Sequence, residues 1–148
     1  MSTRTHIGLF VAVLGVVAAA PLPAAGDGFA LIGNAKAATQ SQSKAEVRAL
    51  YTGKSKTLDG NAVLVVVRGE DDVVFVAFVD QVFGIPTRAL LSKIKQEVFK
   101  GEMPKPIKAA SDDEVVQAVA ASPGALGVVS TDAAGHLPKT VKVIAVGG

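Results

Sequence analysis

The chain has 148 residues, no cysteine, and a formal net charge of +2 from 15 Lys and Arg against 13 Asp and Glu. Without cysteine it has no disulfide, no thiolate metal site and no lipid-modified N-terminal cysteine. Lysines are spread along the chain and aromatic residues are only 5% of it, which argues against nucleic-acid binding by a basic patch or a base-stacking surface.

The N-terminal segment is typical of a secretory signal peptide. Arg4 precedes an unbroken apolar run of 14 residues, Ile7 to Ala20, which Pro21 and Pro23 end. A membrane-spanning helix needs about 20 apolar residues, so we expect the segment to be removed, leaving no membrane anchor. The protein is therefore predicted to be periplasmic or secreted.

Two cleavage sites compete. Ala24-Ala25-Gly26 lies at a normal distance from the apolar run, whereas Ala35-Lys36-Ala37 is the cleaner small-x-small match but lies farther away. Cleavage after Ala37 would also discard Phe29–Ile32, which is expected to be a strand of the mature domain. We favour cleavage after Gly26, with a signal peptide over 1–26 and one domain over 27–148, too short for two lobes.

The first half of this domain is predicted to contain a strand, a helix and a second strand. After Phe29–Ile32, the S-x-x-E motif that starts at Ser43 predicts a capped helix start. The apolar face of that helix ends at Gly53. Asp59-Gly60 then marks a turn, and the valine-rich run Ala62–Val67 predicts a strand buried on both faces.

The second half is predicted to contain three helices and two strands. Val73–Val82 favours a buried helix, with a long strand as the alternative because Val and Phe suit both. Thr87 is expected to cap the next helix, and the S-x-x-E motif at Ser111 the last one. Strands are expected at Ala125–Val129 and Val141–Val146. The whole pattern predicts an α/β fold with a mixed, mostly parallel sheet flanked by helices.

Residues suited to catalysis are scarce. His6 leaves with the signal peptide, and His136 lies in a Gly-His-Leu-Pro turn, where we expect it to be exposed. No G-x-S-x-G motif is present, and one histidine cannot supply a metal-ligand set. We therefore predict a protein that is not an enzyme and holds no metal or cofactor.

A ligand site has a physical basis where the valine strand meets the next helix. Ligands of parallel sheets bind beyond the carboxyl ends of strands, where the first helix amides offer N–H groups and a positive dipole end. Arg68 would add a planar cation suited to an oxyanion. The alternative is an ordinary edge arginine paired with Glu70 or Asp72.

The order of motifs resembles phosphate-binding proteins of ABC uptake systems, especially short relatives built around one lobe. The resemblance covers about Phe29 to Val146 and rests on the helix and turn over 45–54, the helix and turn over 91–101, and Pro-Gly-Ala-Leu-Gly-Val-Val over 123–129. It implies a single lobe of the periplasmic-binding-protein fold that binds phosphate or a related oxyanion, for ABC uptake or sensing with a transporter partner. Glycines 53, 101, 124 and 127 of these motifs are expected at turns with positive φ.

The resemblance also implies ligand-binding positions. The family's strand ends in Arg-Ser-x-Gly-Ser-Gly-Thr, and Arg68, Gly69, Asp71 and Asp72 are the corresponding positions that we predict to bind ligand. Asp72-Val73-Val74 replaces the closing Ser-Gly-Thr. Carboxylates at a helix start satisfy the same amides as a phosphate and repel a dianion. The alternative function is therefore a structural or protein-interaction module that has lost its ligand pocket.

Overall fold

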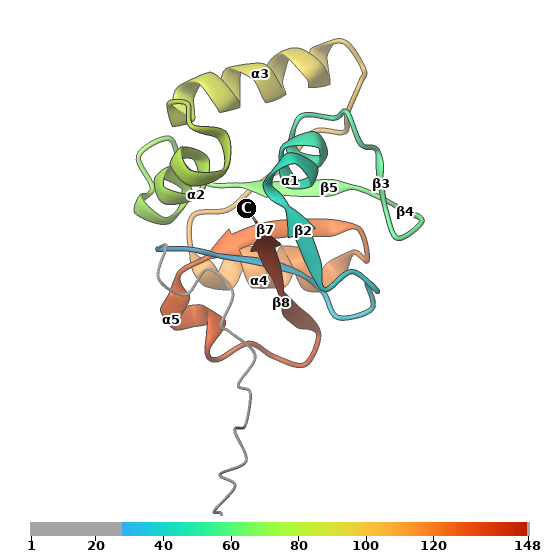
Figure 1. The fold of residues 1–148 in the computed structure, drawn as a ribbon, viewed down its shortest axis with the longest axis vertical. Coiled ribbons are helices and arrows are strands. Elements are labelled where there is room, and N and C mark those ends of the chain that lie inside the picture. Colours follow the sequence, from blue (N-terminus) through green and yellow to red (C-terminus); the bar gives the residue numbers. More distant parts are fainter. Residues whose placement is uncertain (1–27, 148) are drawn as a thin grey trace, which may run out of the picture.

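A computed structural model describes residues 28–147 of the chain. The predicted signal peptide, 1–26, lies outside the described residues. Six strands form one sheet in the order β2-β8-β1-β7-β5-β6, with helices on both of its faces (Figure 1). Two smaller strands form a separate hairpin.

The sheet is mixed and mostly parallel, as predicted. Its strands are β1 (Ala30–Asn34), β2 (Ser41–Ser43), β5 (Leu64–Val67), β6 (Ile107–Lys108), β7 (Ala125–Val129) and β8 (Val141–Gly147). β1 runs antiparallel to β7 and β8, whereas the β2–β8, β5–β6 and β5–β7 pairs are parallel. The valine run thus forms the inner strand β5, and its residues 65–67 are buried.

The longer helices start where the sequence predicts, and one cap differs. They are α1 (Lys44–Tyr51), α2 (Val73–Phe83), α3 (Thr87–Phe99) and α4 (Asp112–Ala121). Ser43 and Glu46 form the predicted capping box of α1, and the 73–82 segment is a helix rather than a strand. Thr87 does not cap α3, because it is buried within the first turn while the Pro86 carbonyl accepts the first helical hydrogen bonds.

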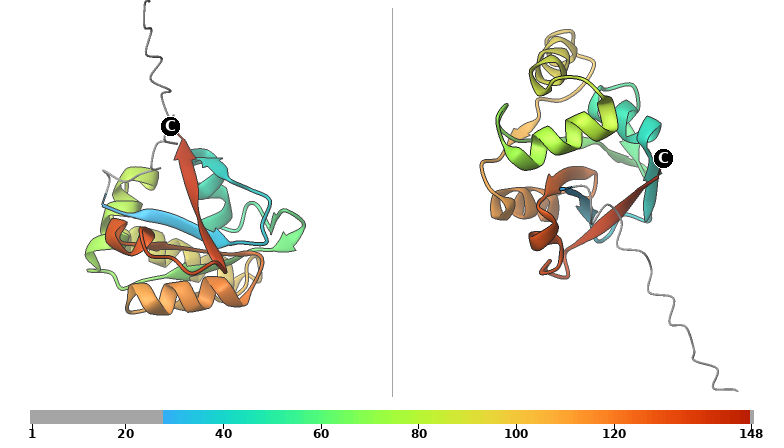
Figure 2. Two further views of the ribbon diagram at one scale, coloured as in Figure 1. Left: turned by 90° about the horizontal axis from the view of Figure 1, so that it is seen from below. Right: turned by 60° about the vertical axis from the view of Figure 1, so that its left-hand side comes forward.

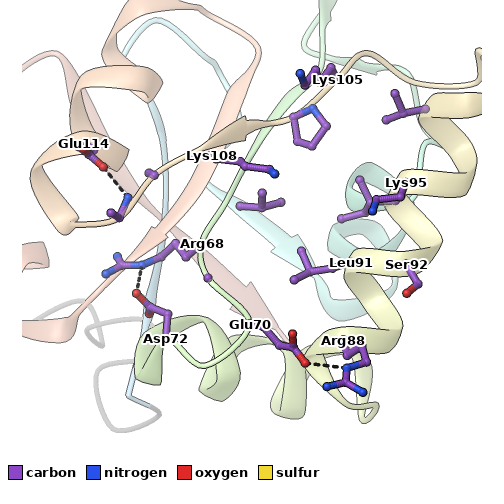
Figure 3. A pocket seen from close by; sticks show the side chains of 17 residues that line it. Arg68, Glu70, Asp72, Arg88, Leu91, Ser92, Lys95, Lys105, Lys108 and Glu114 are labelled. Carbon is purple, nitrogen blue, oxygen red and sulfur yellow. Dashed lines mark hydrogen bonds and ion pairs between the residues drawn. The ribbon is translucent and has the colours of Figure 1, made fainter.

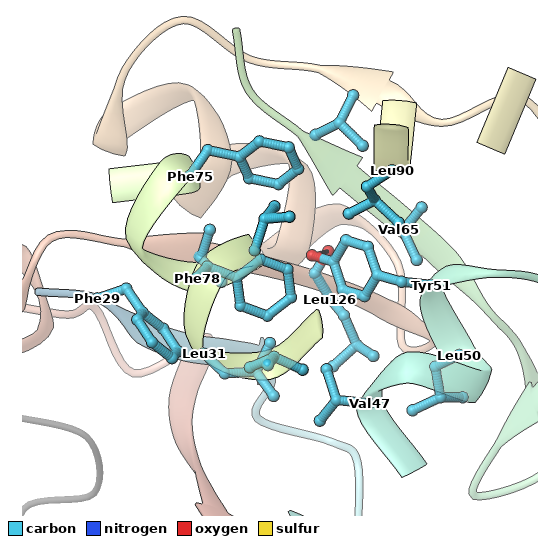
Figure 4. Packing of buried hydrophobic residues seen from close by; sticks show 14 of the residues in the cluster. Phe29, Leu31, Val47, Leu50, Tyr51, Val65, Phe75, Phe78, Leu90 and Leu126 are labelled. Atoms are coloured by element: carbon cyan, nitrogen blue, oxygen red, sulfur yellow. Dashed lines mark hydrogen bonds between the residues drawn. The ribbon is translucent and has the colours of Figure 1, made fainter. Parts of the chain in front are cut away.

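Side-chain alternation along the strands divides the core into two layers. In β5, Val65 and Val67 face α1, α2 and α3, whereas Val66 faces α4. The first layer centres on Phe78, whose ring contacts Phe29 and Tyr51 among other rings (Figure 4). Figure 2 shows α4 and the short α5 (Thr131–Ala134) on the opposite side of the sheet.

Two glycines predicted at positive φ serve another purpose. Gly53 and Gly101 have φ of 79° and 77°, as predicted, but Gly124 and Gly127 are not in that region. A Cβ on Gly127 would lie 2.5 Å from Cγ1 of Val115, and one on Gly124 would lie 2.0 Å from the Ala62 carbonyl oxygen. Both positions need glycine because neighbouring elements approach closely, so the predicted positive φ is wrong there. Gly124 does lie in a turn, in which the Ala125 N–H donates to the Ser122 carbonyl, whereas Gly127 lies within β7.

Short elements were not predicted. These are β2, β6, α5 and the hairpin of β3 (Thr57–Leu58) and β4 (Asn61–Ala62), whose Asp59-Gly60 turn was foreseen. Asp59 and Gly60 both have positive φ, which matches the twist of a tight hairpin. Within 28–147 no single helix is long and apolar enough to span a membrane. Taken together, α2 and α3 have the required length and composition, but an 80° bend separates them.

Candidate functional site

Arg68 lies at the carboxyl end of β5, and its side chain is only 6% exposed. Its Nε donates to Asp72 Oδ2 at 2.9 Å, and its Nη1 donates to Asp112 Oδ1 at 2.8 Å and to the Val128 carbonyl at 3.1 Å. The guanidinium is therefore buried among two carboxylates and a backbone acceptor. Each of these charge-assisted contacts is stronger than it would be in water, because the surroundings have a low dielectric constant.

Asp72 connects this arginine to the start of α2. While one of its oxygens accepts from Arg68, the other accepts from the backbone N–H groups of Val74 and Phe75, both at 3.0 Å. Figure 3 shows the Arg68–Asp72 pair at the end of β5, above α2. A carboxylate of the chain itself thus occupies the arginine fork and helix amides that suit an oxyanion.

Asp112 was missed as a partner of Arg68. It is the first residue of α4, and besides the arginine it accepts from the backbone N–H of Ser130 at 3.0 Å and from its hydroxyl at 2.7 Å. Burial tends to raise the pKa of Asp112, but hydrogen bonds from Arg68 and Ser130 outweigh it, and the pKa lies below its ordinary value. The sequence offered only an S-x-x-E cap here, with no sign that Asp112 points toward a strand 44 residues earlier.

The other predicted ligand-binding residues are near but contribute differently. Gly69 is exposed and forms the turn into α2, where its carbonyl accepts from the Asp72 N–H at 3.1 Å. Asp71 is exposed on that turn. Glu70 does not pair with Arg68, because it accepts from Arg88 Nε of α3 at 2.7 Å. Arg68 and Asp72 are thus brought together, while Gly69 and Asp71 lie on the turn between them.

A cleft of about 980 Å³ extends from this junction between α3 and the strands β5 and β6. Arg68, Gly69 and Asp72 are at one end of it. Figure 3 shows Leu91 of α3 reaching toward β5, and Lys108 of β6 reaching toward α3. The cleft therefore combines an apolar helix face with cations from the sheet edge.

His136 is an exposed turn residue, as predicted, with Nδ1 3.1 Å from the Asp132 carbonyl oxygen. No group of three or more His, Cys, Asp or Glu residues with metal-binding geometry occurs among the described residues. The most distinctive polar site of residues 28–147 is the Arg68–Asp72–Asp112 cluster.

Comparison with known proteins finds similarity in structure but no match in sequence. No protein-family model matches the chain, and no curated protein matches it in sequence. An ABC-type phosphate transport receptor from Vibrio cholerae aligns over 81% of this chain and 46% of its own, with a TM-score of 0.61 and 17% identity.

Two further structures agree with it. A possible phosphate binding protein from Planctomyces limnophilus aligns with a TM-score of 0.59 and 17% identity, over 81% of this chain and 41% of its own. A putative phosphate ABC transporter substrate-binding protein from Clostridium perfringens, solved with bound phosphate, aligns with a TM-score of 0.54 and 16% identity. The alignment covers 81% of this chain and 45% of that protein. The chain thus has the fold found in part of phosphate-binding proteins of ABC transporters, and it spans less than half the length of each.

Proposed function

We propose that this protein is an exported lobe of the solute-binding fold that acts by binding a protein partner, and that its own Asp72 occupies the position of an anionic ligand. The observation that carries the proposal is the double engagement of Asp72 with the Arg68 guanidinium and the first amides of α2. A phosphate would need the same donors.

Charge balance favours the internal carboxylate. Arg68 carries one positive charge and already faces Asp72 and Asp112 at hydrogen-bond distance. A phosphate dianion at the same place would be repelled by both carboxylates, and displacing either would leave an unpaired charge in a partly buried site. The more stable arrangement is thus the one in which Asp72, rather than a phosphate, contacts Arg68 and the first amides of α2.

A partner is supported by apolar surface beside this site. Val73 and Val76, on adjacent turns of α2, are 82% and 41% exposed. Residues three apart lie on the same face of a helix, so the two valines form a small contiguous apolar patch, the kind of surface that larger interaction sites are built from. The chain also spans less than half of the solved binders it resembles, so partner binding is proposed for this part alone and not carried over from the whole binders.

Export and processing belong to the same proposal. Removal of 1–26 would leave β1 intact, whereas cleavage after Ala37 would remove it. β1 lies between β7 and β8 in the sheet, which supports cleavage after Gly26. N-terminal sequencing of the exported protein is expected to begin at Asp27, and a start at Ala38 would contradict this assignment.

An anion-panel thermal-shift measurement tests the occupied site. The unmodified protein is expected to show the same melting temperature with and without millimolar phosphate or sulfate. The variant Asp72→Ser/Val73→Gly/Val74→Thr, which restores the family's Ser-Gly-Thr, is expected to gain a phosphate-dependent rise, because it frees the Arg68 Nε and the first helix amides. If the variant folds and phosphate does not raise its melting temperature, Asp72 does not occupy the position of an anionic ligand.

The second candidate is oxyanion binding for uptake or sensing by Arg68, Gly69, Asp71 and Asp72. It is favoured by the place of Arg68 beside the start of α2 and by the phosphate-binding neighbours. It predicts that phosphate raises the melting temperature of the unmodified protein and that Arg68→Ala abolishes the rise. That outcome would replace the leading proposal. Since the neighbours are substrate-binding proteins, both candidates are non-enzymatic.

A further inference from the structure

The cleft between α3 and the sheet ends at an open strand edge. β6 is the last strand of the sheet and pairs on one side with β5, in the register Val66 with Ile107 and Val67 with Lys108. Ala109 N–H donates to the Val67 carbonyl. Since alternate residues of a parallel strand bond to one neighbour, the N–H and C=O of Lys108 point away from β5. Such an edge can accept another strand.

The helix opposite this edge offers an apolar surface. Leu91, Ile94 and Val98 of α3 line the cleft, and Leu91 and Val98 are only partly buried. A strand added beside β6 would lie close to this face of the helix. Its alternate side chains would gain the apolar cover that the present sheet does not provide.

The charge of the cleft specifies the chemistry of the incoming strand. Lys95, Lys105 and Lys108 line it, all exposed, and none forms an ion pair within the described part of the chain. The other charged residues of the lining are engaged: Arg88 pairs with Glu70, Arg68 pairs with Asp72, and the Glu114 carboxylate accepts from the Ala110 N–H. Lys108 lies on the edge strand itself, with Lys105 just before it and Lys95 on α3. A lysine on an edge strand opposes pairing with a second copy of the same chain, and the three cations together attract an acidic partner.

We propose that the cleft binds an extended acidic segment of the partner protein, which adds as a strand to β6 beneath α3. The proposal rests on the proposed partner-binding function and adds the cleft as a contact surface separate from Val73 and Val76 of α2. Backbone hydrogen bonds to Lys108 align the strand, its apolar residues contact Leu91 and Val98, and its carboxylates pair with Lys95, Lys105 and Lys108.

Fluorescence anisotropy with two labelled eight-residue peptides tests it. One alternates valine and glutamate, and the other alternates valine and lysine. The purified protein is expected to bind the glutamate peptide and not the lysine peptide. Equal binding of both, or binding of neither, would overturn the proposal.

Variants separate charge from backbone pairing. Lys95→Glu is expected to weaken binding of the glutamate peptide by about tenfold, while Lys139→Glu, an exposed lysine outside the cleft, leaves it unchanged. Lys108→Gln removes a charge and keeps the outward N–H, whereas Lys108→Pro removes both. Lys108→Pro should bind more weakly than Lys108→Gln, and equal affinity would rule out strand addition. Circular dichroism checks that each variant is folded, and Lys95→Glu tests the surface without altering β6.

The outcome is distinguishable from failure of the proposed function. A phosphate-dependent thermal shift that requires Arg68 would overturn the partner-binding function itself. No phosphate effect and no binding of the glutamate peptide would overturn only the assignment of the cleft.

Discussion

The Arg68 guanidinium is buried and is neutralised by carboxylates from two separate elements. Removing it would leave Asp72 and Asp112 without the cation that they share. We expect Arg68→Ala to lower the free energy of unfolding by about 3 to 5 kcal/mol, because truncating one partner of a buried pair leaves uncompensated charge. Urea denaturation measures this value.

Arg88→Ala is the matched control. Arg88 also forms an ion pair, with Glu70, but its side chain is 81% exposed. Its loss should lower the free energy of unfolding far less than the loss of Arg68, because solvent screens an exposed ion pair. Similar losses for the two variants would mean that the buried cluster does not stabilise the fold.

The pKa of Asp112 predicts a pH dependence. Because it is lower in the folded protein than in the unfolded chain, the folded state favours the ionised carboxylate. The resulting stability is present above the ordinary Asp pKa of about 4 and is lost as the pH falls below it. Melting temperatures between pH 7 and pH 3 should fall less steeply for Asp112→Asn than for the unmodified protein. A parallel fall in both would contradict the role of this carboxylate.

At the level of single elements, the packing of α4 on the sheet depends on Gly127. A methyl group there would meet Val115 at 2.5 Å and Val66 at 3.2 Å. We expect Gly127→Ala to destabilise the protein by about 1 to 3 kcal/mol through overpacking. Gly135→Ala is the control, since its nearest neighbour would be 3.5 Å away and its φ is −82°. That control should stay within about 0.5 kcal/mol in thermal unfolding.

The longer elements follow from sequence because their signals are local. The capping box at Ser43, the apolar periodicity of α3 and the valine run of β5 each specify a structure without distant partners. β6 has only two residues and exists because it pairs with β5. Similarly, Pro86 rather than Thr87 is the N-cap of α3, because tertiary packing buries the threonine in the first turn.

At the level of the whole molecule, the two core layers share one sheet. β1, β5 and β7 contribute alternate side chains to both layers, so neither layer persists without the other. We expect a single cooperative unfolding transition. Tyr51 is the sole tyrosine and lies in the first layer, and the chain has no tryptophan. Urea curves from Tyr51 fluorescence and far-ultraviolet circular dichroism should coincide, and separate midpoints would contradict this coupling.

The site was only partly predictable for a related reason. Arg68 and Asp72 are four residues apart, so their pairing was one of two alternatives open from sequence. Asp112 and the Val128 carbonyl reach Arg68 only because β5, β7 and α4 are adjacent in the fold. The cleft likewise depends on where α3 lies relative to β6, which no local pattern specifies.

The covalent connection between Asp72 and Arg68 affects how the protein responds to dissolved anions. The Asp72 carboxylate lies four positions along the chain from the arginine that it contacts, so its effective concentration at Arg68 does not change when the protein is diluted. A dissolved anion has to compete with this carboxylate at every concentration. In a binder whose site is open, by contrast, the occupancy of the site and the stability of the protein rise with the concentration of the ligand. On the proposed function, the stability of the protein is therefore expected to be the same at low and at high anion concentration.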